Sequence, residues 1–148
     1  MKIIKLAIVS DHAGYILKEN LLSYLLKEHY EVKDFGCFSE ESVDYPDFGH
    51  QLANSVASGE FDLGISICGT GNGINMTANK HPGIRSALCW NEEISRLARA
   101  HNDANICALP GRFLSDSEAY LIVKTFLSTD FEGGRHKIRV DKISLKIY

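Results

Sequence analysis

The chain alternates between short apolar runs of strand length and longer segments with helical periodicity. The apolar runs are KIIKLAIVS, YEVKDF, DLGISIC, GIRSALCW and ANICALP, and the segments between them include YILKENLLSYLLKEH. In that segment the apolar residues from Ile16 to Leu26 recur at the spacing of one helix face. Such alternation builds βαβ units, whose strands are parallel and whose helices cover both faces of the sheet. The sequence therefore predicts a three-layer α/β/α Rossmann-like domain with a parallel sheet of about five strands.

Nothing in the sequence divides the chain further. Its 148 residues fit one domain of ordinary size, and no internal repeat, low-complexity tract or long linker interrupts them. We therefore expect residues 1–148 to form a single domain. The last two segments, DSEAYLIVKTFLS and RHKIRVDKISLKIY, are predicted to be closing helices, the second entered through Gly133 and Gly134.

Charge, hydropathy and cysteine spacing exclude several classes of protein. A net charge of −3 lacks the surplus of Lys and Arg that nucleic-acid binding usually requires. No apolar stretch approaches the ~20 residues that span a membrane, and the basic and apolar start runs into Asp11 without a small-residue cleavage site. The sequence thus predicts a cytoplasmic protein without nucleic-acid or membrane partners. No cysteines form a CxxC pair, so we expect reduced thiols and no metal site. The four cysteines are Cys37, Cys68, Cys89 and Cys107.

A glycine-rich loop follows the third predicted strand. Ligands of open parallel sheets bind at the carboxyl ends of the strands, where such loops gather. Gly69, Gly71 and Gly73 allow sharp turns and present backbone N–H groups, and a helix predicted over about residues 74–80 adds its positive amino end. The spacing matches neither the phosphate loop of nucleotide hydrolases nor the dinucleotide fingerprint. The loop is therefore predicted to cradle a small anion or an oxyanion.

Cys68 ends the strand that feeds this loop. The N–H dipoles of the loop favour the thiolate, which is the form competent as a base or nucleophile. The alternative is packing, because cysteine is among the most buried residue types. We keep the packing interpretation for the other three cysteines, which have no such loop beside them.

Further polar residues follow other predicted strands. Asp11 and His12 come directly after the first strand. Asp11 suits a helix N-cap, and His12 is placed to donate to a phosphate or a sugar hydroxyl, unless it is only a solvated loop residue. Tyr45, before Pro46, is interpreted either as a contact that covers the site or as a packed loop aromatic.

Three arginines are candidate phosphate ligands. Arg135 and Arg139 are spaced i, i+4, which places two guanidinium groups on one face of a helix. Arg112, in the loop after the fifth strand, is a third candidate. The alternative for the pair is an ordinary solvated helix face.

His101 and Asn102 lie between a helix and the strand that follows it. Loops of this kind emerge at the edge of the sheet opposite the glycine loop, so within one subunit both residues should be far from Cys68. If His101 takes part in the chemistry, it must reach the site of a partner subunit. That condition predicts a symmetric dimer with sites at the interface, and the alternative is an ordinary exposed histidine.

Six motifs together make the chain resemble the type B ribose-5-phosphate isomerases, within the group that includes galactose-6-phosphate isomerase subunits. They cover nearly the whole chain in the family's order, and their combination is far more specific than any one of them. The motifs are SDHAG (10–14), DYP (44–46), ICGTGNGI (67–74), ANKHPGIR (78–85), HNDAN (101–105) and EGGRHKIRV (132–140).

The resemblance implies interconversion of ribose 5-phosphate and ribulose 5-phosphate through a cis-enediolate, with neither metal nor organic cofactor. It makes Cys68 the base that moves a proton between C2 and C1, His101 the acid/base that opens the furanose ring, and Thr70 an aid to proton movement at the sugar oxygens. It also implies a homodimer with shared sites, and leaves open whether dimers pair into tetramers. The implied substrate-binding set is Asp11, His12, Tyr45, Gly69, Gly71, Asn72, Gly73, Asn102, Arg112, Arg135 and Arg139, of which His12 and the arginines hold the phosphate and Asp11 and Asn102 the sugar hydroxyls.

Two other functions remain open from the sequence. A six-carbon sugar-phosphate isomerase, acting on allose 6-phosphate or galactose 6-phosphate, would share these motifs, because pocket length is not readable from them. A non-catalytic module that binds sugar phosphates would need the glycine loop and the arginines but neither Cys68 nor His101. The joint presence of those two residues argues against it.

Overall fold

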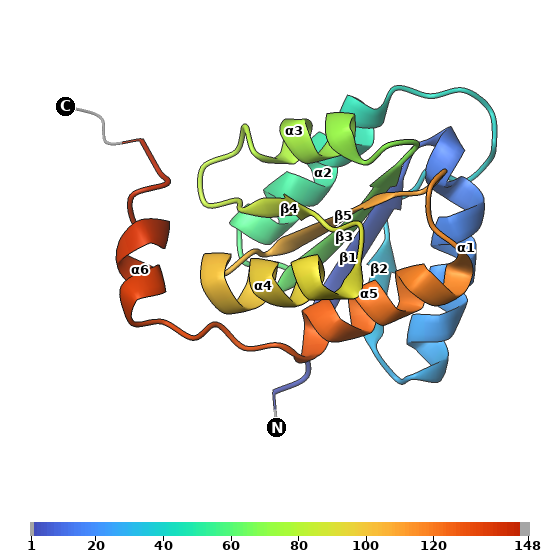
Figure 1. Ribbon diagram of the computed structural model, residues 1–148. Coiled ribbons are helices and arrows are strands. Elements are labelled where there is room, and N and C mark those ends of the chain that lie inside the picture. The colour runs from blue at the N-terminus through green and yellow to red at the C-terminus, as the bar shows by residue number, and fades with distance from the viewer. Residues whose placement is uncertain (1, 146–148) are drawn as a thin grey trace.

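The computed structural model describes residues 2–145, and its sheet confirms the predicted fold class (Figure 1). Neighbouring strands pair in parallel, in the order β2-β1-β3-β5-β4. The strands are β1 (Lys5–Ser10), β2 (Glu31–Asp34), β3 (Leu63–Cys68), β4 (Ser86–Leu88) and β5 (Ile106–Pro110). The helices are α1 (Tyr15–Lys27), α2 (Tyr45–Ala57), α3 (Asn72–Ala78), α4 (Glu92–Asn102), α5 (Asp116–Ser128) and α6 (Arg135–Val140), with a 3-10 turn η1 (His12–Gly14) before α1.

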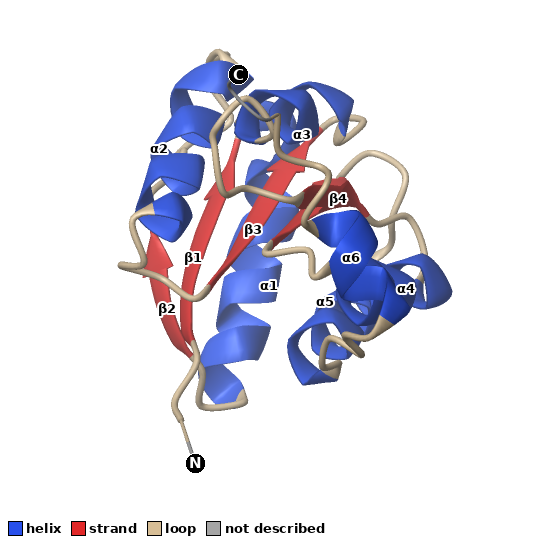
Figure 2. Cartoon of the chain, turned by 90° about the vertical axis from the view of Figure 1, so that its left-hand side faces the viewer, coloured by secondary structure: helices blue, strands red, loops and turns tan. Residues whose placement is uncertain are grey.

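Helices cover both faces of the sheet, as Figures 1 and 2 show. The side chains of β1 alternate between two apolar clusters, because successive residues of a strand point to opposite faces. Leu6 and Ile8 pack with α1, α4 and α5, whereas Ala7 and Val9 pack with α2 and α3. The result is a three-layer sandwich. Within residues 2–145, no helix combines the length and the apolar character needed to cross a membrane.

Two predicted helix boundaries differ from the structure. The helix after the glycine loop starts at Asn72, two residues early, because Gly71 adopts a left-handed backbone (φ 75°) and the helix begins directly after it. The last predicted helix ends at Val140, and turns follow over residues 141–143. None of its residues is buried, so it lacks the apolar face that normally stabilises a helix in a protein. The rest of that prediction, residues 146–148, lies outside the described residues.

The order of the strands creates one topological switch point. From β1 the chain passes through α1 to β2 on one side, whereas from β3 it passes through α3 to β4 on the other side, beyond β5. The loops that follow β1 and β3 therefore diverge at the carboxyl ends of these neighbouring strands, which is where ligands bind in open α/β sheets.

A buried ion pair joins α1 to the end of β2. The Lys18 side chain is fully buried, and its Nζ donates to Asp34 Oδ2 at 2.6 Å and to Glu19 Oε1 at 2.8 Å. Burial works against the charge, but the hydrogen bonds that Lys18 donates to Asp34 and Glu19 outweigh it, so the pKa of Lys18 is raised above its ordinary value of 10.5.

Replacing Lys18 by methionine is expected to lower the free energy of unfolding by about 3 kcal/mol near pH 7, because Asp34 loses the charge it faces in a largely buried position. Since the folded-state pKa of Lys18 is raised, its contribution is fully present below about pH 10.5 and is lost as the pH rises through the folded value. The difference between wild type and Lys18→Met should therefore narrow above that pH. Urea unfolding of both proteins across this range measures it.

The matched control is Lys27→Met, at the exposed end of the same helix, which should change stability by no more than about 0.5 kcal/mol. A loss for Lys18→Met no larger than that of this control would contradict the role of the buried pair.

Candidate active site

The loops that follow β1, β3 and β5 meet at the switch point. Backbone hydrogen bonds tie them together: Asp11 N–H donates to Ile67 O at 3.0 Å, and Gly111 N–H donates to Cys68 O at 2.8 Å. These contacts bring the candidate residues of three separate segments to one edge of the sheet.

Side chains from the start of α2, the end of β4 and the loop after β5 lie against the glycine loop. A Cβ on Gly73 would lie 2.5 Å from the Tyr45 ring, and one on Gly69 would lie 3.1 Å from the Arg112 guanidinium. Gly71 has φ 75°, and a Cβ there would come within 2.5 Å of Leu88, so a side chain is excluded twice over. Tyr45 and Arg112 therefore flank the loop closely, and the role of Tyr45 as a substrate contact stays a prediction.

Cys68 lies at the end of β3 with only 4% of its surface exposed, within the apolar cluster on the α2 and α3 face. All four cysteines are free in the structure. A buried position is consistent both with a packing role for Cys68 and with a role as a base, so its chemical role stays a prediction. Cys89 and Cys107 lie in the core on the other face, where burial raises the pKa of Cys107, and neither adjoins the glycine loop.

Asp11 and His12 both have defined partners. Asp11 Oδ1 accepts from Gly14 N–H at 3.1 Å, which confirms the N-cap interpretation. His12 Nδ1 accepts from Val43 N–H at 3.1 Å, so in the neutral ring the proton is on Nε2. His12 is therefore a half-buried, oriented donor rather than a freely solvated side chain.

Thr70 and Asn72 form the exposed tip of the glycine loop. The Asn72 N–H donates to Thr70 Oγ1 at 3.3 Å, so the hydroxyl partly satisfies one amide of the cradle. Thr70 is thus within hydrogen-bonding range of the loop backbone and open to a ligand.

Four predicted site residues are not brought to this edge within one chain. His101 and Asn102 end α4, and Arg135 and Arg139 belong to α6, which packs against α4 (Figures 1 and 2). His101 and Asn102 precede β5 and Arg112 follows it, so the length of that strand, roughly 16 Å, separates them. This separation within one chain is what the sequence predicted.

His136 is a neighbour of His101 that sequence reasoning missed, although it stands in the EGGRHKIRV motif. The two rings stack with centroids 4.1 Å apart at 10°, and Glu132 Oε2 lies 3.5 Å from His136 Nε2 and 3.9 Å from His101 Nε2. Burial, and then the charges of His101 and Arg135, lower the pKa of His136.

The same three residues are the one group of potential metal ligands that lie close together within residues 2–145. A nitrogen lone pair lies in the plane of its ring, so two nearly parallel rings cannot both point at one ion. The stacked arrangement of His101 and His136 is therefore not built to hold a metal.

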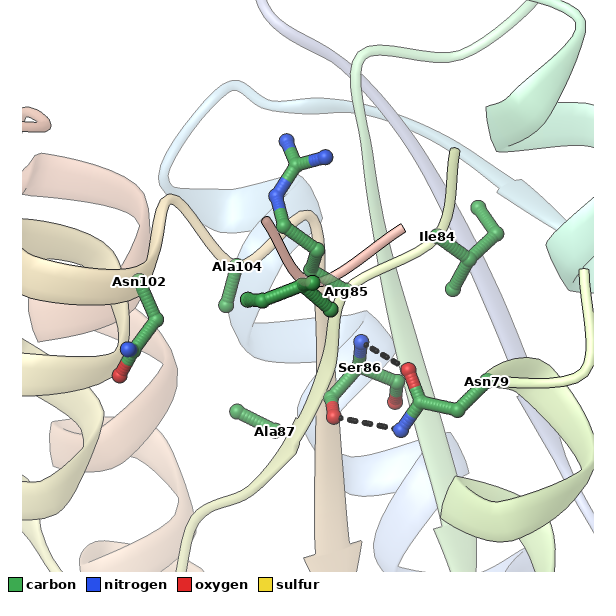
Figure 3. A pocket seen from close by; sticks show the side chains of 8 residues that line it. Asn79, Ile84, Arg85, Ser86, Ala87, Asn102 and Ala104 are labelled. Atoms are coloured by element: carbon green, nitrogen blue, oxygen red, sulfur yellow. Dashed lines mark hydrogen bonds between the residues drawn. The ribbon is translucent and has the colours of Figure 1, made fainter. Parts of the chain in front are cut away.

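A pocket of about 340 Å³ lies at the opposite edge of the sheet, beside the start of β4, and not at the glycine loop (Figure 3). Its polar wall includes Asn102, so the pocket adjoins the segment assigned to the sugar hydroxyls. It is lined by Asn79, Ile84, Arg85, Ser86, Ala87, Asn102, Ala104 and Ile143.

Comparison with known proteins identifies the family of this chain. It matches the family described as Ribose/Galactose Isomerase over residues 6–143. It is 44% identical over 140 residues to ribose-5-phosphate isomerase B of Escherichia coli, covering 95% of this chain and 94% of that protein. A ribose 5-phosphate isomerase structure from Thermotoga maritima superposes with a TM-score of 0.93 at 53% identity, covering 95% of this chain and 97% of the other. Ribose-5-phosphate isomerase B from Mycoplasma genitalium, solved with bound ribulose-5-phosphate, gives 0.90 at 44% identity, covering 94% and 93%. The chain therefore belongs to the Ribose/Galactose Isomerase family.

Proposed function

We propose that this protein interconverts D-ribose 5-phosphate and D-ribulose 5-phosphate through a cis-enediolate, with neither metal nor organic cofactor. The observation that carries the proposal is the set of groups gathered at the switch point, where Cys68 ends β3 beside a glycine loop flanked by Arg112 and Tyr45. A thiol, a set of amide donors and cationic or donor groups at one edge of the sheet suit proton transfer on a phosphorylated sugar.

The chemistry assigns one role to each group. The Cys68 thiolate removes the proton from C2 of the open-chain aldose and returns it to C1, while a proton moves from O2 to O1 with help from Thr70. Amides of residues 69–73 stabilise the oxygens of the enediolate, an effect worth several kcal/mol in comparable sites, about 3 kcal/mol per donor. The phosphate is held by His12 through Nε2 and by Arg112.

A homodimer completes the site in this proposal. One chain gathers Cys68 and the glycine loop at one edge of the sheet and presents His101, Asn102 and the two α6 arginines at the other, so neither set suffices alone. A two-fold axis can bring each set to its complement. His101 of one subunit then opens the furanose ring, and Asn102 holds a hydroxyl. We further propose that residues 1–148 act as a single cytoplasmic domain.

Turnover of purified protein on ribose 5-phosphate tests the function. We expect ribulose 5-phosphate to form at a rate that survives EDTA, is lost on thiol alkylation and is protected by substrate, because the base is a cysteine and no metal takes part. Absence of turnover would overturn the pentose assignment. Allose 6-phosphate and galactose 6-phosphate are then the substrates to compare by kcat/KM, and tight binding without turnover of any of them would indicate a binding module.

A further inference from the structure

The motif ANKHPGIR, residues 78–85, has no part in the chemistry above, yet it leads into β4 beside the end of α4 (Figure 3). We propose that Arg85 is a positioning residue that holds His101 and Asn102 in place through Asp103. This inference rests on the proposed function, because His101 is assigned there to ring opening and Asn102 to a sugar hydroxyl.

The backbone conformation of Asp103 depends on stabilising contacts. It ends α4 directly after His101 and Asn102, with a left-handed backbone (φ 47°, ψ 43°) that residues other than glycine adopt at a cost. A strained residue at this point stays in place only if its surroundings fix it. The direction of the chain at His101 and Asn102 therefore depends on the contacts of Asp103.

Arg85 grips Asp103 with its side chain. Its Nε donates to the Asp103 carbonyl oxygen at 2.8 Å, and its Nη2 donates to Asp103 Oδ2 at 3.2 Å. The other carboxylate oxygen accepts from Arg99 Nη1 at 3.1 Å, so the carboxylate is held from two sides. A planar guanidinium fork fixes both position and orientation, which a lysine cannot do. Arg99 belongs to α4 itself, so among the hydrogen bonds of residues 2–145 only those from Arg85 tie Asp103 to a different segment.

The backbone of Arg85 is tied to the same stretch. Arg85 N–H donates to Asn105 Oδ1 at 2.8 Å, and Asn105 N–H donates to the Arg85 carbonyl oxygen at 2.9 Å. Residues 103–105 are thus fixed to Arg85 through its main chain as well as its side chain.

Asn79 in turn anchors Arg85. β4 is an edge strand, and the Asn79 side chain pairs with the backbone of Ser86 in place of a further strand, donating from Nδ2 to Ser86 O at 2.9 Å and accepting Ser86 N–H at 2.8 Å (Figure 3). The motif therefore forms a continuous brace from α3 through the start of β4 to the His101 segment.

The test compares the two directions of the reaction in Arg85→Met. Ribose 5-phosphate is mainly a closed furanose and must be opened, whereas ribulose 5-phosphate has no hydroxyl free to close such a ring. A displaced His101 therefore slows the aldose direction selectively. We expect kcat from ribose 5-phosphate to fall about tenfold and kcat from ribulose 5-phosphate to fall no more than about twofold. Arg96→Met is the control and should match wild type, because Arg96 lies on α4 with its side chain paired to Glu93 at the surface and makes no hydrogen bond to Asp103.

Each result decides the inference. An unchanged kcat from ribose 5-phosphate in Arg85→Met would overturn the inference. An equal fall of kcat in both directions would also overturn it, because that result indicates a general structural defect. If Arg85→Met does not fold, the test uses Arg85→Lys, which keeps the positive charge but loses the planar guanidinium. The ratio of kcat from ribose 5-phosphate to kcat from ribulose 5-phosphate is compared with wild type in the same way. Wild-type protein that fails to turn over either sugar would instead overturn the proposed function, so the two failures are distinguishable.

Discussion

Cys68→Ala is expected to lower kcat/KM by about a thousandfold in both directions, because no other thiol adjoins the glycine loop and a general base of this kind contributes about 10²–10⁴-fold. Both directions suffer equally, since the same group must remove the proton from C2 or from C1. Steady-state rates with ribose 5-phosphate and with ribulose 5-phosphate measure the effect.

The matched control is Cys107→Ala, which removes another buried thiol from the core on the opposite face of the sheet. It should cost stability by about 1 kcal/mol, as small core truncations do, but keep activity within about twofold. Binding of ribose 5-phosphate by Cys68→Ala, followed by calorimetry, should persist because the phosphate ligands are intact. If Cys68→Ala instead loses stability and keeps its activity, Cys68 is a packing residue.

The fold was predictable because its signal is local. Apolar runs such as DLGISIC, separated by helical periodicity, define β3 and its neighbours with boundaries within a few residues. The order β2-β1-β3-β5-β4 was not predictable, because periodicity carries no information about which strands pair. The predicted length of α6 was wrong, since its apolar residues Ile138 and Ile143 are mostly exposed and do not form a buried helix face.

The candidate site also has parts that the sequence predicts and parts that it does not. The glycine loop and Cys68 stand next to each other in sequence, so their proximity required no folding information. The contact of Tyr45 with Gly73, the orientation of His12 by Val43 and the grip of Arg85 on Asp103 all join residues 18 or more positions apart. Such contacts can be identified only from the positions of the loops in the structure, and no pattern in the sequence predicts them.

His101→Asn is expected to separate ring opening from proton transfer. Its kcat from ribose 5-phosphate should fall about a hundredfold, because the closed sugar loses its acid/base, while kcat from the open-chain ribulose 5-phosphate should change little. The variant His136→Asn removes the ring that stacks on His101. Its kcat from ribose 5-phosphate should also fall more than its kcat from ribulose 5-phosphate, but by a smaller factor than in His101→Asn. Equal loss in both directions for His101→Asn would assign His101 to substrate binding or to proton transfer instead.

Mixing Cys68→Ala with His101→Asn tests whether sites are shared between subunits. If each site takes Cys68 from one subunit and His101 from the other, a mixed dimer contains one intact site and one doubly altered site. Refolding equal amounts together yields mixed dimers as half of the population, so the aldose activity should rise to roughly one quarter of wild type. Each variant refolded alone should stay at its own low rate. If the mixture only averages the two variants, each site lies within one chain, and the separation of His101 from Cys68 in the fold would then exclude His101 from the chemistry.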